Sequence, residues 1–154
     1  MTVCFLDSSA LVKRYVEEPG SAWIRGLVEP ASRNRFVIAR ATWVEVLSAF
    51  ARRQREGSIA AQDVQQTTDA FRYDLEVQYQ VVELDRSLAD LAGELVTRYL
   101  LRAYDAIQLA SALRLQTGLL QTGSHGLTFV SADERLLGVA DAEGLAVSNP
   151  NLHL

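Results

Sequence analysis

The stretch VCFLDSSALVKRY, residues 3–15, joins a short apolar run directly to a helical pattern. Residues 3–6 predict a buried strand that ends at Asp7, because every side chain before the aspartate is apolar. The two serines that follow offer hydroxyl caps for a helix over residues 10–15, which stops before the sequence EPG. A strand that leads at once into a helix predicts an α/β unit.

The same alternation continues along the chain. A second helix is predicted from Ser21, and further strands at residues 35–39, 79–84, 127–130 and 145–148. Helices are predicted between these strands at residues 42–55, 60–77, 85–100, 103–113 and 133–142. Strands separated by helices favour a central parallel sheet with helices on both faces. We therefore expect a three-layer α/β fold in a single domain spanning residues 1–154.

Composition excludes several classes of protein. With 49% hydrophobic and 22% charged residues, the chain is neither disordered nor of low complexity. Its apolar N-terminal run breaks at Asp7, too early for a signal peptide or a membrane span, so we expect a cytoplasmic protein with no membrane contact. Cys4 is the single cysteine, which cannot form an internal disulfide and suits a core position.

The net charge of −4 argues at first against a nucleic-acid partner. If about four acids gather around a metal, however, the remaining surface is nearly neutral. Lys13 is the only lysine, so 14 of the 15 basic residues are arginines, whose planar guanidinium group suits phosphate. A GC-rich genome would produce the same bias, and both explanations stay open.

Four acidic residues attract attention by their positions. Asp7 and Asp133 follow predicted strands, and ligands of open parallel sheets bind outside the carboxyl ends of strands. Each of these two also suits a helix N-cap. Glu45 and Asp105 lie among apolar residues of predicted helices, although each could belong to a narrow solvent-facing stripe, which for Asp105 would include Gln108.

Convergence of the four acids would explain them better than four separate roles. Carboxylates brought close together repel, and their pKa values rise unless a cation holds them charged. An oxygen-only set favours Mg²⁺, with Mn²⁺ as an alternative, whereas Cys4, His125 and His153 offer no plausible zinc set. A carboxylate-held Mg²⁺ is a familiar means of activating water against a phosphodiester.

Four motifs carry a resemblance to a known family. In order and spacing, FLDSSALVKRYVEEPGS, TWVEVLSAF, LRAYDAIQLASAL and FVSADERLL closely resemble the PIN-domain ribonucleases, specifically the VapC toxins of bacterial type II toxin-antitoxin systems. The resemblance covers nearly the whole chain and implies a Rossmann-like PIN fold with Mg²⁺-dependent endoribonuclease activity. It implies that the catalytic and metal-binding acids are Asp7, Glu45, Asp105 and Asp133. Ser131, two residues before the last acid, matches a hydroxyl that recurs in the family and could brace the pocket.

The same resemblance implies partners: an RNA substrate, a second copy of the chain in a homodimer, and a cognate VapB-type antitoxin. One departure from the family is a longer connection at residues 118–126, which we expect to be a loop insertion. We expect Arg98 and Arg102, on the helical face of Asp105, and Arg52, on the helical face of Glu45, to bind RNA phosphates. Ion pairing with acids or simple surface solvation are the alternatives for these arginines.

Two other functions compete with RNA cleavage. A phosphotransferase or dehalogenase with an aspartyl nucleophile would also have an aspartate after its first strand, but such enzymes commonly carry a second aspartate where this chain has Ser9. The second alternative is a catalytically silent PIN scaffold that binds RNA or a protein without cutting. The presence of all four acids argues against it.

Overall fold

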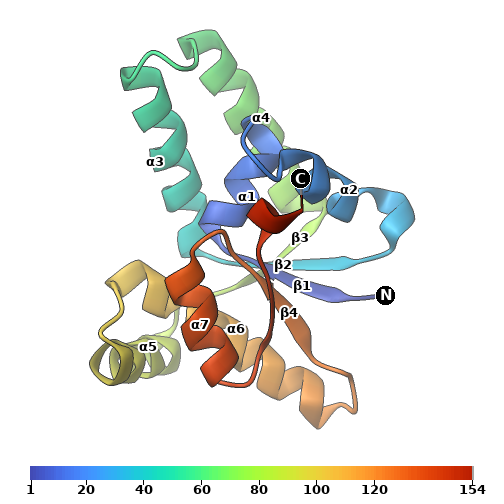
Figure 1. Ribbon diagram of the computed structural model, residues 1–154, viewed down its shortest axis with the longest axis vertical. Coiled ribbons are helices and arrows are strands. Elements are labelled where there is room, and N and C mark those ends of the chain that lie inside the picture. Colours follow the sequence, from blue (N-terminus) through green and yellow to red (C-terminus); the bar gives the residue numbers. More distant parts are fainter. Residues whose placement is uncertain (154) are drawn as a thin grey trace.

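The structure, a computed structural model, describes residues 1–153 (Figure 1). The described strands are β1 (Val3–Leu6), β2 (Arg35–Ala39), β3 (Tyr79–Val82), β4 (Leu127–Val130) and β5 (Ala146–Ser148). The α-helices are α1 (Ser8–Tyr15), α2 (Ser21–Val28), α3 (Ala41–Arg55), α4 (Ala61–Val77), α5 (Arg86–Tyr99), α6 (Ala103–Gln121) and α7 (Glu134–Ala142). Two short 3-10 helices are η1 (Pro30–Ser32) and η2 (Pro150–Leu152). None of the described helices has the length and apolarity that crossing a membrane requires.

The described strands form one parallel sheet in the order β3-β2-β1-β4-β5. β1 is central, and its first residue, Val3, is paired with Arg35 of β2 and with Leu127 of β4. The chain moves outward from β1 through β2 to β3, and later crosses to the other side of β1 to add β4 and β5. This reversal places a topological switch point between β1 and β4, where open α/β sheets bind ligands.

The central strand shows why the sheet needs a helical layer on each face. Side chains alternate along a strand, so Val3 and Phe5 join one hydrophobic cluster while Cys4 and Leu6 join the other. All four residues of β1 are buried, as expected when both faces of a sheet are covered. The expected three-layer α/β fold is confirmed.

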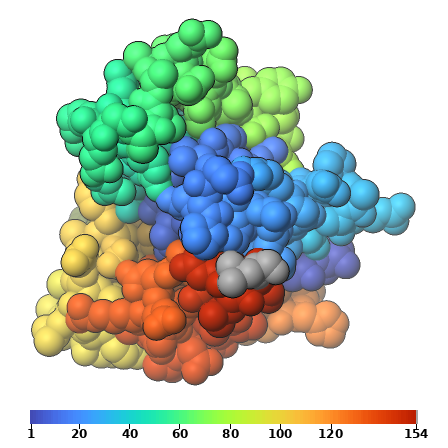
Figure 2. Space-filling view, turned by 45° about the horizontal axis from the view of Figure 1, so that its top comes forward, coloured from blue at the N-terminus to red at the C-terminus, as the bar shows by residue number. Residues whose placement is uncertain are grey.

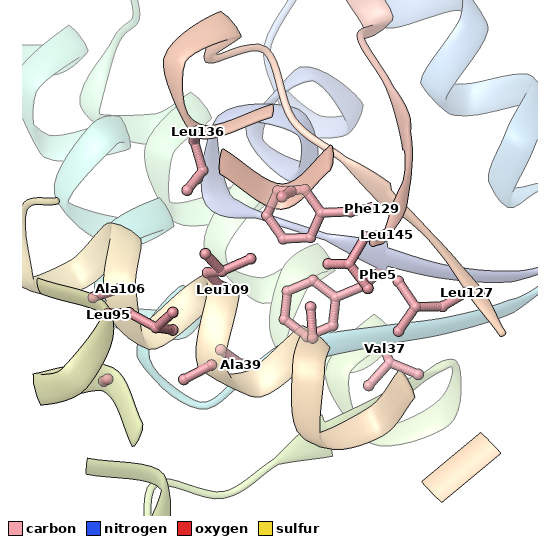
Figure 3. Packing of buried hydrophobic residues seen from close by; sticks show 14 of the residues in the cluster. Phe5, Val37, Ala39, Leu95, Ala106, Leu109, Leu127, Phe129, Leu136 and Leu145 are labelled. Carbon is pink, nitrogen blue, oxygen red and sulfur yellow. The ribbon is translucent and has the colours of Figure 1, made fainter. Parts of the chain in front are cut away.

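Helices α5, α6 and α7 cover one face of the sheet (Figure 1). Against this face the rings of Phe5 and Phe129 stack with their centroids 5.7 Å apart. Leu109 of α6 and Leu136 of α7 belong to the same fully buried cluster (Figure 3). These contacts fix β1 against β4, the two strands whose carboxyl ends lead to Asp7 and Asp133.

Helices α1 to α4 cover the opposite face, and α3 and α4 form a hairpin that projects beyond the sheet (Figures 1 and 2). Phe50 of α3 and Phe71 of α4 are fully buried. Both rings pack against Tyr15 of α1, with centroid distances of 6.2 Å and 5.3 Å. The base of the hairpin is therefore anchored to the helix that follows β1.

The C-terminal segment packs against the start of α2. Gly20 precedes this helix with φ +89°, and a Cβ atom at this position would lie 2.5 Å from the carbonyl oxygen of Pro150 in η2. Nearby, the rings of Trp23 and His153 stack with centroids 4.2 Å apart. Close backbone approach and left-handed conformation together require glycine at position 20.

The expected loop at residues 118–126 is wrong in extent. Helix α6 continues through Gly118 to Gln121, and only residues 122–126 connect it to β4. Leu119, a residue of α6, is buried in the core. This packing outweighs the low helix propensity of the neighbouring Gly118. The connection is therefore shorter than the sequence suggests.

Candidate active site

Asp7 lies at the carboxyl end of β1 and caps α1. Its Oδ1 accepts hydrogen bonds from the Ala10 amide at 2.9 Å and the Ser9 hydroxyl at 2.7 Å, and its Oδ2 accepts one from Ser131 at 2.6 Å. The sequence suggested serine caps and a start at residue 10, but α1 begins at Ser8 because the Asp7 carboxylate satisfies an amide of the first turn. Asp7 is buried, with only 3% of its surface exposed.

Ser131 ties the ends of β1 and β4 together. Besides donating to Asp7, its Oγ accepts a hydrogen bond from the Asp133 amide at 3.0 Å and lies 3.3 Å from Ser9 Oγ. Ser131 is fully buried. Ser131 therefore contacts the carboxylate of Asp7 and the backbone amide of Asp133.

Glu45 lies in the second turn of α3 and is held from two neighbouring helices. Its Oε2 accepts a hydrogen bond from Ser8 Oγ of α1 at 3.0 Å, and its Oε1 accepts one from Gln108 Nε2 of α6 at 2.8 Å. Gln108 Nε2 also donates to Thr42 Oγ1 at 2.8 Å. The carboxylate is therefore fixed by partners distant in sequence.

Asp105 and Asp133 lie at the N-terminal ends of helices, where the helix dipole favours negative charge. Asp133 caps α7, with its Oδ1 accepting from the amides of Arg135 and Leu136 at 3.0 Å and 3.1 Å. Asp105 is half-buried in the first turn of α6. Its carboxylate forms no side-chain hydrogen bond or ion pair that the structure records within residues 1–153.

Electrostatics link the four acids in a row. Burial is the main cause that raises the pKa of Asp7 to about 6, and the charge of Glu45 contributes. Burial also raises the pKa of Glu45, with a contribution from Asp105, and raises the pKa of Asp105, with a contribution from Asp133. Across residues 1–153, every ion pair involves other acids. The row therefore carries negative charge that a bound cation would stabilise.

The acids do not form a ready-made metal site. In the described part of the chain, no three Asp, Glu, His or Cys side chains come together closely enough to hold a metal. The donor chemistry nevertheless fits a hard cation, since all four acids offer carboxylate oxygens. Gln108 Oε1 adds a buried oxygen with no hydrogen-bond partner among the same residues. This oxygen-rich set fits Mg²⁺ or Mn²⁺ better than zinc.

A cleft of about 620 Å³ is lined by Glu45 and by the chain neighbours of the other three acids, Ser8, Tyr104 and Ala132. Ser8 and Glu45 lie on its wall, next to Tyr104, which precedes Asp105. Arg102 also lines this opening, as does Arg52 of α3. Carboxylates and guanidinium groups thus share one cleft, the combination needed to place a phosphate beside a cation.

Arg98 does not share this cleft. Helix α5 ends at Tyr99, and Leu100 adopts a left-handed φ of 55° before α6 begins. The expectation that Arg98 and Arg102 lie on the helical face of Asp105 is therefore wrong, because Arg98 belongs to α5 and Arg102 is the extended N-cap residue before α6. The Arg98 guanidinium instead donates a hydrogen bond to Glu143 Oε1 at 2.9 Å.

Sequence reasoning missed three polar side chains of the site. Ser8 and Ser9 were assigned only as helix caps, yet their hydroxyls bind two of the acids. One alternative put Gln108 on a solvent-facing stripe with Asp105, but Gln108 is 1% exposed and contacts Glu45. Its spacing of three residues from Asp105 was the available signal, since both lie on one side of α6.

The arrangement of the acids around a parallel sheet invites comparison with known families. A family model for the PIN domain matches residues 4–142. The chain belongs to the PIN-domain family. The match includes Asp7, Glu45, Asp105 and Asp133, so the row of acids lies wholly inside the PIN domain.

Full-length relatives place this PIN domain in the VapC group. Ribonuclease VapC45 of Mycobacterium tuberculosis is 30% identical over 154 residues, which cover 99% of each chain. Ribonuclease VapC46 of the same species is 30% identical over 151 residues, covering 98% of this chain and 100% of the relative. The resemblance to VapC proteins is therefore confirmed.

A solved structure supports the same fold. The crystal structure of VapBC2 from Rickettsia felis, bound to a DNA fragment from their promoter, contains a chain that superposes with a TM-score of 0.62. The two chains are 16% identical, and the superposition covers 96% of this chain and 98% of the other. At this level of identity, the similarity concerns the PIN fold.

Proposed function

We propose that this PIN-domain protein is a Mg²⁺-dependent endoribonuclease that acts as the toxin of a type II toxin-antitoxin pair. The observation that carries the proposal is the row of four acids, Asp7, Glu45, Asp105 and Asp133, which have no basic partner among the described ion pairs. One of them, Glu45, lines a cleft that arginines also line. The names of the VapC relatives, which are ribonucleases, support the same activity.

The four acids would hold the cation, with Mn²⁺ as an alternative to Mg²⁺. When bound, the cation supplies water activation and neutralises charge on the phosphodiester. Ser131 and Ser9 orient Asp7, while Ser8 and Gln108 orient Glu45, so each carboxylate is fixed before substrate arrives.

Substrate binding would fall to the cationic wall of the cleft. Arg52 and Arg102 line the opening that Glu45 shares, so each can contact RNA phosphates on either side of the cleaved bond. These contacts would bring the RNA backbone to the acids without reading its bases.

The remaining parts of the proposal concern partners and location. Similarity to the Rickettsia felis VapBC2 structure supports a cognate VapB-type antitoxin. A homodimer, a cytoplasmic location and a single domain spanning residues 1–154 complete the proposal. Each of these can be measured on the purified protein or in its cell of origin.

Cleavage of total cellular RNA by the purified chain, freed of any antitoxin, tests the proposal. We expect discrete fragments in Mg²⁺ and none in EDTA, and no fragments from Asp105→Asn. Asp90→Asn is the matched control, because Asp90 is an exposed acid of α5 outside the cleft. Intact RNA with wild-type protein in Mg²⁺ and Mn²⁺ would favour the catalytically silent scaffold.

A further inference from the structure

A second set of charged side chains lines the same cleft and takes no part in the proposed chemistry. Lys13 Nζ donates a hydrogen bond to Glu18 Oε2 at 3.3 Å, and Arg53 Nη2 donates to the other oxygen of the same carboxylate. All three residues line the cleft. We call Lys13, Glu18 and Arg53 the basic triad.

Helix geometry fixes the triad relative to the acids. Lys13 lies four residues after Ser9 on α1, so both side chains share one face of the helix that Asp7 caps. Arg53 extends from α3, the helix that carries Glu45, and its guanidinium also donates to the Ala49 carbonyl at 3.4 Å. The two cations therefore sit on the same helices as two of the acids.

The charges of the triad do not cancel. Two cations share one carboxylate, and the side chains of Lys13 and Arg53 are only 6% and 17% exposed. Burial, together with the charge of Arg53, lowers the pKa of Lys13. The charge of Asp7 acts on Lys13 in the opposite sense. A bound anion would stabilise the positive charge that remains on this wall of the cleft, because buried charge needs a partner.

The ligand chemistry follows from the donors. An ammonium group has three N–H donors, of which Lys13 uses one in a recorded hydrogen bond, and guanidinium groups match phosphate oxygens. Arg52 lies beside Arg53 on the same wall. These donors fit an anionic group that carries several oxygens. They also fit a flexible chain in which such groups repeat at regular spacing.

We propose that Lys13 and Arg53, aligned by Glu18, bind a phosphate of the RNA strand adjacent to the phosphate held at the acids. This inference rests on the proposed function, because it assigns RNA to the cleft. The basic triad thereby positions the strand, while the acids act on the neighbouring phosphodiester.

Equilibrium binding tests the inference without cleavage. The full chain carrying Asp105→Asn is titrated into a fluorescein-labelled oligouridylate, and anisotropy is followed at several NaCl concentrations. Lys13→Gln and Arg53→Gln should each weaken binding about 5- to 10-fold at low salt and lower the slope of log affinity against log salt by about 0.7, the value per phosphate contact of a single strand. Lys13→Arg should retain binding, and Glu18→Gln should not weaken it.

Arg86→Gln is the control for charge, because Arg86 is an exposed arginine of α5 outside the cleft. It should change affinity less than twofold. Unchanged affinity and salt slope in folded Lys13→Gln and Arg53→Gln would overturn the inference, as would a parent protein that does not bind the oligouridylate. If RNA binding depends on Lys13 but wild-type protein in Mg²⁺ leaves RNA intact, the proposed function fails and the phosphate subsite stands.

Discussion

Ser131 Oγ lies 2.6 Å from Asp7 Oδ2 and joins two residues that are 124 positions apart in the sequence. The bond links the end of β4 to the end of β1, on the two sides of the switch point of the sheet. Because both partners are buried, the hydroxyl is a main source of stabilisation for the Asp7 carboxylate.

Replacing Ser131 should therefore destabilise the fold as well as the site. We expect Ser131→Ala to lower the free energy of unfolding by about 1.5–3 kcal/mol, the usual range for a hydrogen bond to a charged group. Urea denaturation measures the loss. Ser48→Ala, at an exposed serine of α3, is the control and should change stability by less than about 0.5 kcal/mol. Equal stabilities of the two variants would contradict this account of Ser131.

The raised pKa of Asp7 predicts a pH dependence of the metal-free protein. The folded state holds a proton on Asp7 up to about pH 6, whereas the unfolded chain releases it near its ordinary value of 3.8. The unfolded state therefore binds fewer protons between these values, and stability falls as pH rises through this window. The loss due to Asp7 should reach about 3 kcal/mol, because one pKa unit corresponds to about 1.4 kcal/mol.

Comparison with Asp7→Asn isolates this effect from the other acids. In EDTA, the stability of wild type relative to Asp7→Asn should decrease from pH 4 to pH 6 and then level off. Mg²⁺ should raise the melting temperature of wild type at pH 7 far more than at pH 4. Parallel pH profiles of the two proteins would show that burial of Asp7 is not what shifts its titration.

Arg102 and Arg98 provide a matched pair for substrate binding. Arg102 lines the cleft, while Arg98 bonds to Glu143 away from it. We expect Arg102→Gln to raise KM for an RNA oligonucleotide about fivefold with little change in kcat, as for the loss of a uniform binding contact. Arg98→Gln should change neither constant by more than twofold. Steady-state cleavage assays would contradict the assignment if the two variants behaved alike.

Gly20 and Gly57 test the packing of the C-terminal segment. Both have positive φ, but a Cβ atom would meet the Pro150 carbonyl oxygen at 2.5 Å only at Gly20, while Gly57 has nothing within 4 Å. Gly57→Ala should cost about 1 kcal/mol, the usual strain of a left-handed residue. Gly20→Ala should cost at least about 2 kcal/mol more, because backbone must also shift. Thermal melts of the two variants make the comparison. Equal losses of stability would show that η2 can move away from residue 20 at no energetic cost.

Local patterns were sufficient to predict the layers of the fold. The apolar run at residues 3–6 and the helical pattern after it correspond to β1 and α1, and the acids predicted at strand ends do follow β1 and β4. Such features depend on near neighbours in the chain. The helix-cap alternative for Asp7 and Asp133 is also correct, since one carboxylate oxygen caps the helix and leaves the other for different partners.

Features that depend on distant contacts were not predictable from the pattern alone. Gln108 resembles a surface residue in the sequence, and only the packing of α6 against α3 reveals that it contacts Glu45. Arg98 was expected on the helical face of Asp105, but the left-handed turn at Leu100, which carries no glycine signal, changes the direction of the chain between α5 and α6. The basic triad was missed for the same reason, because Glu18 bonds to Arg53, which lies 35 positions further along the chain, as well as to Lys13.

The central position of β1 has a consequence for synthesis of the protein. β1 leaves the ribosome first, yet one of its two partners in the sheet, β4, is among the last elements to emerge. Until then, Asp7 lacks the hydroxyl of Ser131, and Asp133 does not yet exist in the nascent chain. The four acids of the proposed site therefore cannot come together until β4 and the start of α7 have been translated.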